Sequence, residues 1–154
     1  MIVTDVDQLR LPCSDVSSLE EAQEIIRALQ DELKASSLRG QPGIGLAAPQ
    51  IGIQKNVAIV RLPDLQGRNY SLNLINPKLH SGRLGAHFDQ EGCLSFPNQR
   101  ERVYRYQEIC VDNYLDSKMI ESLVLMGLPA VVAQHEYDHL IGKLLIDHVD
   151  GKKK

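Results

Sequence analysis

The chain has 154 residues, of which 43% are hydrophobic and 24% are charged, a composition typical of one soluble globular domain with its own core. The net charge of −3 argues against a nucleic-acid-binding surface, because phosphate contacts need clustered Lys and Arg. No apolar run is long enough to span a membrane, and the N-terminus lacks the basic start and apolar stretch of a secretory signal. We therefore expect one domain over residues 1–154 that binds neither nucleic acid nor membrane.

The first predicted element is a helix over residues 18–38, where apolar side chains recur every three or four positions. Either Ser17 with Glu20 or Ser18 with Glu21 can form a capping box at its start. After this helix comes a loop rich in glycine and other small residues, QPGIGLAAPQIG. The loop lacks the lysine and the glycine spacing of a phosphate-binding loop, so we do not expect it to bind a nucleotide.

Residues with high strand propensity then gather in several short runs. The predicted strands cover residues 57–61, 70–75, 101–115 and 119–125. Asp116 and Ser117 predict a turn between the last two.

A second helix is predicted over residues 128–141, with Pro129 in its first turn and Gly142 as a C-terminal glycine cap. Strands in one block between two helices favour an α+β fold with mainly antiparallel pairing. In this fold the 18–38 helix is N-terminal, and the 128–141 helix carries the motif described next.

The second helix contains QHEYDH, residues 134–139. His135 and His139 are one helical turn apart, so both imidazoles leave the same face and can reach one ion. Glu136 lies beside them, as in the H-E-x-x-H arrangement whose glutamate is a general base. The competing interpretation is an ordinary core helix, in which a lone histidine is more often packed or hydrogen-bonded. Two histidines at this spacing beside a glutamate favour a metal site.

A hydrolytic metal needs a further protein ligand and one open position. Downstream the chain offers Asp147, His148 and Asp150, but no glycine turn joins His139 to His148 as in one class of H-E-x-x-H peptidases. Upstream, EGCLSFP places Cys93 after a glycine, and we expect it at a turn or strand end. Taken alone, Cys93 would be a buried small apolar residue. With Cys13 and Cys110 it makes an odd number of cysteines, which indicates free thiols in a reducing compartment.

Three segments stand in one order along the chain: GIGLAAPQ at 43–50, EGCLS at 91–95 and QHEYDHLIG at 134–142. Together they resemble the signature motifs of the peptide deformylases, and the resemblance covers nearly the whole chain. It implies an enzyme that removes the formyl group from the formyl-methionine of nascent polypeptides and releases formate. It also implies one divalent cation per chain, Fe²⁺ in the cell, with Zn²⁺, Ni²⁺ or Co²⁺ able to substitute. The implied ligands are Cys93, His135 and His139, with water in the fourth place.

The resemblance also implies roles for three further residues. Glu136 would be the acid/base, and Gln50 with the backbone N–H of Leu94 would form the oxyanion hole. The chemistry of these residue types agrees. A bound divalent ion can lower the pKa of its water to about 7, and Glu136 can take the remaining proton and pass one to the leaving amine. One oxyanion donor is typically worth about 2.7–4 kcal/mol.

For the substrate, the resemblance implies an extended peptide paired with the backbone around Ile44 and Gly45, where the absence of a glycine side chain permits close approach.

Glu91 is expected to pair with Arg105 and brace the Cys93 turn; the alternative is two solvated charges. The methionine side chain would enter a mostly apolar pocket. The implied pocket residues are Ile44, Arg100, Leu128, Val131, Val132 and His135.

The chain departs from the family pattern at three places. Tyr137 occupies a variable position, and we expect no loss of chemistry. Asp89 stands where the family often has an apolar residue at the pocket rim. The sequence ends a dozen residues beyond Gly142, whereas many bacterial members continue into a helix that docks on the ribosome. We therefore expect a compact variant that does not dock on the ribosome through such a helix. Separately, we expect a monomer in the cytoplasm of a bacterium or of a virus-infected bacterial cell; an organelle protein that has lost its leader is the less favoured alternative.

Two other functions compete with deformylation. A general H-E-x-x-H peptidase would cleave internal peptide bonds and would need no Cys93. A binding module with a structural metal site would have a closed site and would not depend on Glu136. The presence of both Glu136 and Gln50 argues against the binding module, because neither is needed merely to hold an ion.

Overall fold

The computed structural model describes residues 1–63 and 69–148. Asp150, one of the candidate ligands, and the rest of the tail lie outside the described residues. Among the described helices, none is both long and apolar enough to cross a membrane. The elements, in order, are α1 (Val6–Leu9), α2 (Leu19–Leu38), β1 (Gly45–Ala47), the 3-10 helix η1 (Ala48–Ile51), β2 (Val57–Pro63), β3 (Asn69–Ile75), β4 (Lys78–Cys93), β5 (Phe96–Leu115), β6 (Lys118–Met126), α3 (Leu128–Leu140) and the 3-10 helix η2 (Leu145–His148).

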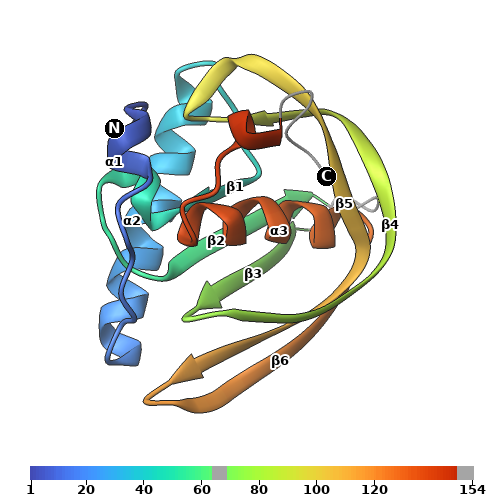
Figure 1. Cartoon of the computed structure of the whole chain (residues 1–154). Helices are drawn as coiled ribbons and strands as arrows, with labels where there is room; N and C mark the ends of the chain where they lie inside the picture. The colour runs from blue at the N-terminus through green and yellow to red at the C-terminus, as the bar shows by residue number, and fades with distance from the viewer. Residues whose placement is uncertain (64–68, 149–154) are drawn as a thin grey trace.

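The strands form two antiparallel three-stranded sheets, β1-β2-β3 and β4-β5-β6. Figure 1 shows α3 in the middle of the molecule, with α2 beyond the first sheet and the long β4-β5 ribbon curving around the other side. This is the α+β fold with antiparallel sheets predicted from the sequence, and that prediction is confirmed.

Alternation along β2 explains why helices cover both faces of the first sheet. Val57 and Ile59 pack into the cluster that contains the apolar stripe of α2. Ala58 and Val60 point the other way, into the cluster that contains α3 and the inner side of β5. Because each face of β2 is apolar, α2 and α3 are held on opposite sides of one sheet.

The predicted start of α2 is confirmed with a small change. Ser18 is the N-cap, and its side chain accepts a hydrogen bond from the Glu21 N–H at 3.0 Å. The Glu21 carboxylate reaches back to the N–H of Ser17 (2.9 Å) rather than to the N-cap residue itself. The helix therefore begins one residue later than predicted, with two backbone donors satisfied.

The predicted turn between the last two strands is present, with Asp116 and Ser117 both at positive φ (52° and 63°), as a tight hairpin requires. The prediction missed α1, β1 and the whole of β4. The β4 sequence is mostly polar and glycine-rich, and most of its residues are exposed. It therefore carries no apolar alternation, and its pairing with β5 stabilises it as a strand.

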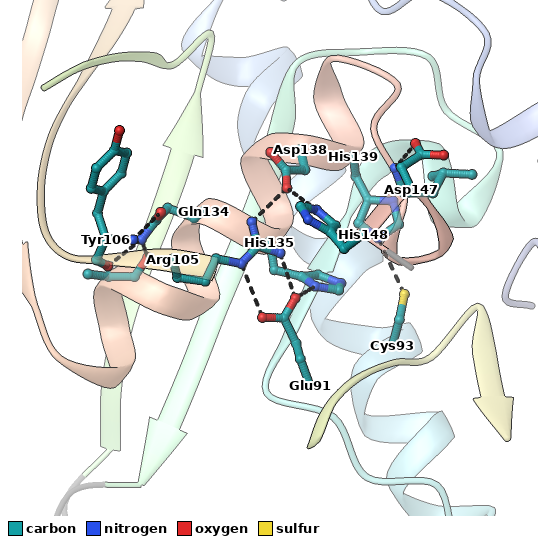
Figure 2. Close-up of polar contacts among 12 residues, drawn as sticks. Glu91, Cys93, Arg105, Tyr106, Gln134, His135, Asp138, His139, Asp147 and His148 are labelled. Atoms are coloured by element: carbon teal, nitrogen blue, oxygen red, sulfur yellow. Dashed lines mark hydrogen bonds and ion pairs between the residues drawn. The ribbon is translucent and has the colours of Figure 1, made fainter. Parts of the chain in front are cut away.

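The side chain of Gln134 holds α3 against β5. Its Oε1 accepts from the Tyr106 N–H at 3.0 Å, and its Nε2 donates to the Tyr106 carbonyl at 2.7 Å. The amide thus pairs with both backbone groups of one strand residue, as a neighbouring strand would (Figure 2). This contact fixes the helix that carries the two predicted histidine ligands.

A buried asparagine joins the two sheets. Asn113 on β5 accepts from the Ile75 N–H (2.9 Å) and donates to the Asn73 carbonyl (2.9 Å), both on β3. Its Nδ2 also donates to the Glu121 carboxylate on β6 at 3.0 Å. With the Asn113 side chain fully buried, the two backbone groups of β3 depend on it for a partner, whereas Glu121 is exposed.

We expect Asn113→Ala to lower the free energy of unfolding by about 3 kcal/mol, because it strands buried backbone groups of β3. Urea unfolding followed by circular dichroism measures this loss. The matched control is Asn56→Ala, which removes an exposed contact with Asp15 and should cost about 0.5 kcal/mol or less. Equal costs for the two variants would contradict the role of Asn113 as the link between the sheets.

Candidate functional site

The three predicted metal ligands converge. His135 and His139 leave one face of α3, and Cys93 is the last residue of β4. One ligand atom from each lies within 4.8 Å of the other two, and Cys93 Sγ is 3.3 Å from His139 Nε2. Figure 2 shows the Cys93 sulfur directed at His139. One thiolate and two imidazoles are a donor set typical of a tetrahedral cation site with its fourth position open.

The neighbouring Glu136 also fits a divalent cation. Its side chain is 4% exposed, and Oε1 has no hydrogen-bond partner among the described residues. Burial raises the pKa of this carboxyl to about 7. A buried carboxylate with one oxygen unpartnered among the described residues, beside three candidate ligands, has the position of a group that can face a cation and its water.

Glu91 lies behind the candidate ligand His135 and fixes its orientation. His135 Nδ1 is 2.6 Å from Glu91 Oε1, which leaves Nε2 for the cation. Arg105 donates to both Glu91 oxygens, at 2.6 and 3.1 Å. Burial alone would raise the pKa of Glu91, but the hydrogen bonds from His135 and Arg105 lower it to about 2. The expected Glu91–Arg105 pair is therefore present, and it is buried rather than solvated.

The downstream candidates for a ligand are engaged elsewhere. Asp147 forms an ion pair with Arg10 at 2.8 Å. His148 Nε2 lies 3.4 Å from Asp138, whose carboxylate also accepts from Arg105 at 2.7 Å (Figure 2). Neither residue joins the ligand group. Of the described candidates, Cys93 is the one that completes the site.

Gln50, the predicted oxyanion donor, reaches the site from η1. Its Nε2 lies 3.0 Å from Ser95 Oγ and 3.5 Å from Cys93 Sγ. Leu94, the other predicted donor, belongs to the two-residue loop that joins the end of β4 to the start of β5. The two donors therefore approach the Cys93 side of the ligand group from different segments.

One cavity of about 600 Å³ opens beside the ligands. Every residue expected to contact substrate borders it: Ile44, Gly45, Glu91, Arg100, Leu128, Val131, Val132 and His135. Glu136 and Gln50 border it as well. The cavity therefore brings the predicted pocket and the predicted chemistry together.

Two residues of this site, Phe88 and Ser95, were not predicted from the sequence. Phe88 lines the cavity, whereas Asp89, the residue expected at the rim, pairs with Arg102 (3.1 Å) on the exposed side. The cause is an irregularity in β4 between Phe88 and Glu91, with Gln90 at φ 63°, which breaks the alternation and directs both flanking residues inward. Ser95 was also not predicted as a site residue. Its place in the EGCLS motif beside Cys93 could have indicated it, and its hydroxyl contacts Gln50.

Comparison with known proteins agrees with this geometry. The family model described as polypeptide deformylase matches residues 1–154. This chain belongs to the peptide deformylase family. As a deformylase it is a hydrolytic enzyme, and the family's activity is removal of the N-formyl group from nascent polypeptides.

Relatives of this deformylase include bacterial and phage proteins. It is 40% identical over 149 residues to peptide deformylase 2 of Bacillus cereus, with 94% of this chain and 81% of the relative covered. A probable peptide deformylase from Synechococcus phage S-SSM7 is 37% identical, with a TM-score of 0.81, and the match covers 96% of this chain and 98% of that one. The Met-Ala-Ser-bound class I type b peptide deformylase of Acinetobacter baumannii is 30% identical, with a TM-score of 0.76 and 97% of each chain covered.

Proposed function

We propose that this deformylase is a metal-dependent hydrolase that removes the formyl group from the N-terminal formyl-methionine of nascent chains and releases formate. The observation that carries the proposal is the convergence of Cys93, His135 and His139 beside the buried Glu136, with Cys93, His135 and Glu136 bordering one cavity. The expected cation is one divalent ion per chain, Fe²⁺ in the cell, with Zn²⁺, Ni²⁺ or Co²⁺ able to substitute. When bound, such a cation polarises a carbonyl group and acidifies water.

Glu136 is the proposed acid/base. It is buried beside the candidate ligands with Oε1 unpartnered among the described residues, so its carboxyl is free to accept a proton and return it. In this role Glu136 takes the proton of the attacking water and delivers one to the leaving amine. The Gln50 amide and the Leu94 N–H are the proposed donors to the negative charge that develops on the formyl oxygen.

The proposed peptide-binding element is β1. It is an edge strand of its sheet, paired on one side with β2. An extended peptide can therefore pair with the other side, near Ile44 and Gly45, and place its first side chain in the cavity. The apolar walls formed by Val131 and Val132 suit the thioether of methionine.

Glu136 lies directly against Gly45, so any side chain at this position would displace the Glu136 carboxylate. A Cβ on Gly45 would come within 2.5 Å of Glu136 Oε2. We expect Gly45→Ala to displace the carboxylate and to lower turnover about 100-fold, as a shift of about 1 Å in a catalytic group can. Steady-state kinetics checks the rate, and metal content together with the melting temperature shows whether the site and fold persist. Unchanged kcat in Gly45→Ala would contradict this prediction, because it would mean that turnover does not depend on the position that Gly45 allows the Glu136 carboxylate to take.

The experiment that tests this function is an anaerobic assay of formate release from formyl-Met-Ala-Ser, run beside acetyl-Met-Ala-Ser. We expect release of formate and no comparable release of acetate. Cleavage of internal peptide bonds would instead indicate the general peptidase. A metal-loaded protein that hydrolyses neither peptide would rule out the proposed function. The expected monomeric state and cellular compartment stay predictions from the sequence.

A further inference from the structure

Ser95 is a buried polar residue at the site with no part in the proposed chemistry. It follows Cys93 and Leu94 in the loop between β4 and β5, and its side chain is 2% exposed. Burial of a hydroxyl has a cost unless the group is hydrogen-bonded, and here the partner is Gln50 Nε2 at 3.0 Å. The Ser95 hydroxyl is therefore buried together with a specific hydrogen-bond partner, which an alanine at this position could not provide.

The amide of Gln50 is held at both ends. Its Oε1 accepts from the Ala47 N–H at 3.0 Å. Because a backbone N–H can only donate, this contact identifies the oxygen end of the amide and turns the nitrogen end toward Ser95. Gln50 is 1% exposed, so water does not compete for either contact.

The nitrogen of an amide has two hydrogens, and their directions are fixed relative to each other. One hydrogen of Gln50 Nε2 is used by Ser95 Oγ. The other is directed at Cys93, whose sulfur accepts a hydrogen bond from the same nitrogen at 3.5 Å. Holding the first hydrogen therefore sets the direction of the second.

We infer that Ser95 is a positioning residue, whose hydroxyl holds the Gln50 amide so that its second N–H stays on the Cys93 side of the ligand group, where it can donate to the formyl oxygen of the substrate. This inference rests on the proposed function, because it requires Gln50 to be an oxyanion donor. The end of β4 then supplies a ligand, Cys93, and the loop that follows supplies a backbone donor from Leu94 and the support for a third group from Ser95. Three consecutive residues place three parts of the site.

Loss of this support affects the transition state more than substrate binding, because charge on the formyl oxygen develops during the reaction. Removal of an oxyanion donor lowers kcat by about 100- to 1000-fold. Misdirecting the donor costs less, so we expect Ser95→Ala to lower kcat by about 10- to 100-fold with little change in KM.

The test is a double-mutant cycle on kcat for formyl-Met-Ala-Ser with Ser95→Ala, Gln50→Ala and the double variant. If Ser95 acts through Gln50, the double variant is no slower than Gln50→Ala alone. Losses that multiply would overturn the inference, because Ser95 would then act independently of Gln50. A wild-type enzyme that releases no formate would overturn the proposed function as well, and a fully active Gln50→Ala would overturn the role of Gln50.

A second pair of variants keeps the test valid if Ser95→Ala does not fold. Ser95→Thr and Ser95→Val have the same shape and differ in the hydroxyl, so the threonine variant should be about tenfold or more faster. Equal kcat values would overturn the inference. Ser122→Ala is the control, since it removes a serine hydroxyl that donates to Asp112 on the second sheet, and its kcat should equal that of the wild type.

Discussion

Glu136→Gln is expected to lose formate release while the protein keeps its metal. The glutamine has the same shape but cannot accept a proton, so kcat should fall by about 100- to 10,000-fold, the usual contribution of a general acid/base. Glu136 lies beside the ligands and is not one of the three converging groups, so metal content should stay at one ion per chain. Steady-state kinetics and metal analysis of the same preparation check both parts.

A matched control for this variant is Glu108→Gln, which removes the same charge from an ion pair with Arg83 on the second sheet. It should leave kcat unchanged. Near-normal turnover in Glu136→Gln would reject the acid/base assignment, and loss of the metal would mean that Glu136 acts as a ligand.

Cys93→Ser is expected to weaken metal binding severely. A serine hydroxyl stays protonated near neutral pH and replaces the thiolate poorly as a ligand. Since loss of a group that merely supports a ligand costs about 10- to 100-fold in metal affinity, loss of the ligand itself should cost more than about 100-fold. Competition with a chelator of known affinity measures the change.

Two other cysteines serve as controls for that measurement. Cys13 and Cys110 are partly buried free thiols outside the ligand group. Cys13→Ser and Cys110→Ser should bind the metal as the wild type does. Full occupancy in Cys93→Ser under the same competition would remove Cys93 from the site.

The α2 and α3 helices and the β5–β6 hairpin could be predicted because each carries a local signal. The cap at Ser18, the apolar stripe of α2 and the turn at Asp116-Ser117 depend on neighbouring residues alone. β4 had no such signal, because its polar residues are ordered by hydrogen bonds to a distant strand. The same holds for Asn113, whose partners on β3 are about 40 residues away.

The site divides in the same way. The spacing of His135 and His139 is a helical property and is visible in the sequence, and Cys93 followed from the resemblance between motifs. The inward position of Phe88 depends on an irregularity in β4, which no alternation pattern predicts. The contact of Ser95 with Gln50 joins residues 45 positions apart. Such contacts become visible only when the fold brings the segments together.

The metal centre is tested most directly by X-ray absorption at the zinc edge of the Zn²⁺-loaded protein, which reports the atoms bound to the ion. With Cys93, His135 and His139 as ligands, the spectrum should contain one sulfur at about 2.3 Å and two imidazole nitrogens at about 2.0–2.1 Å. A zinc ion with no sulfur neighbour would contradict this assignment and, with it, the proposed mechanism.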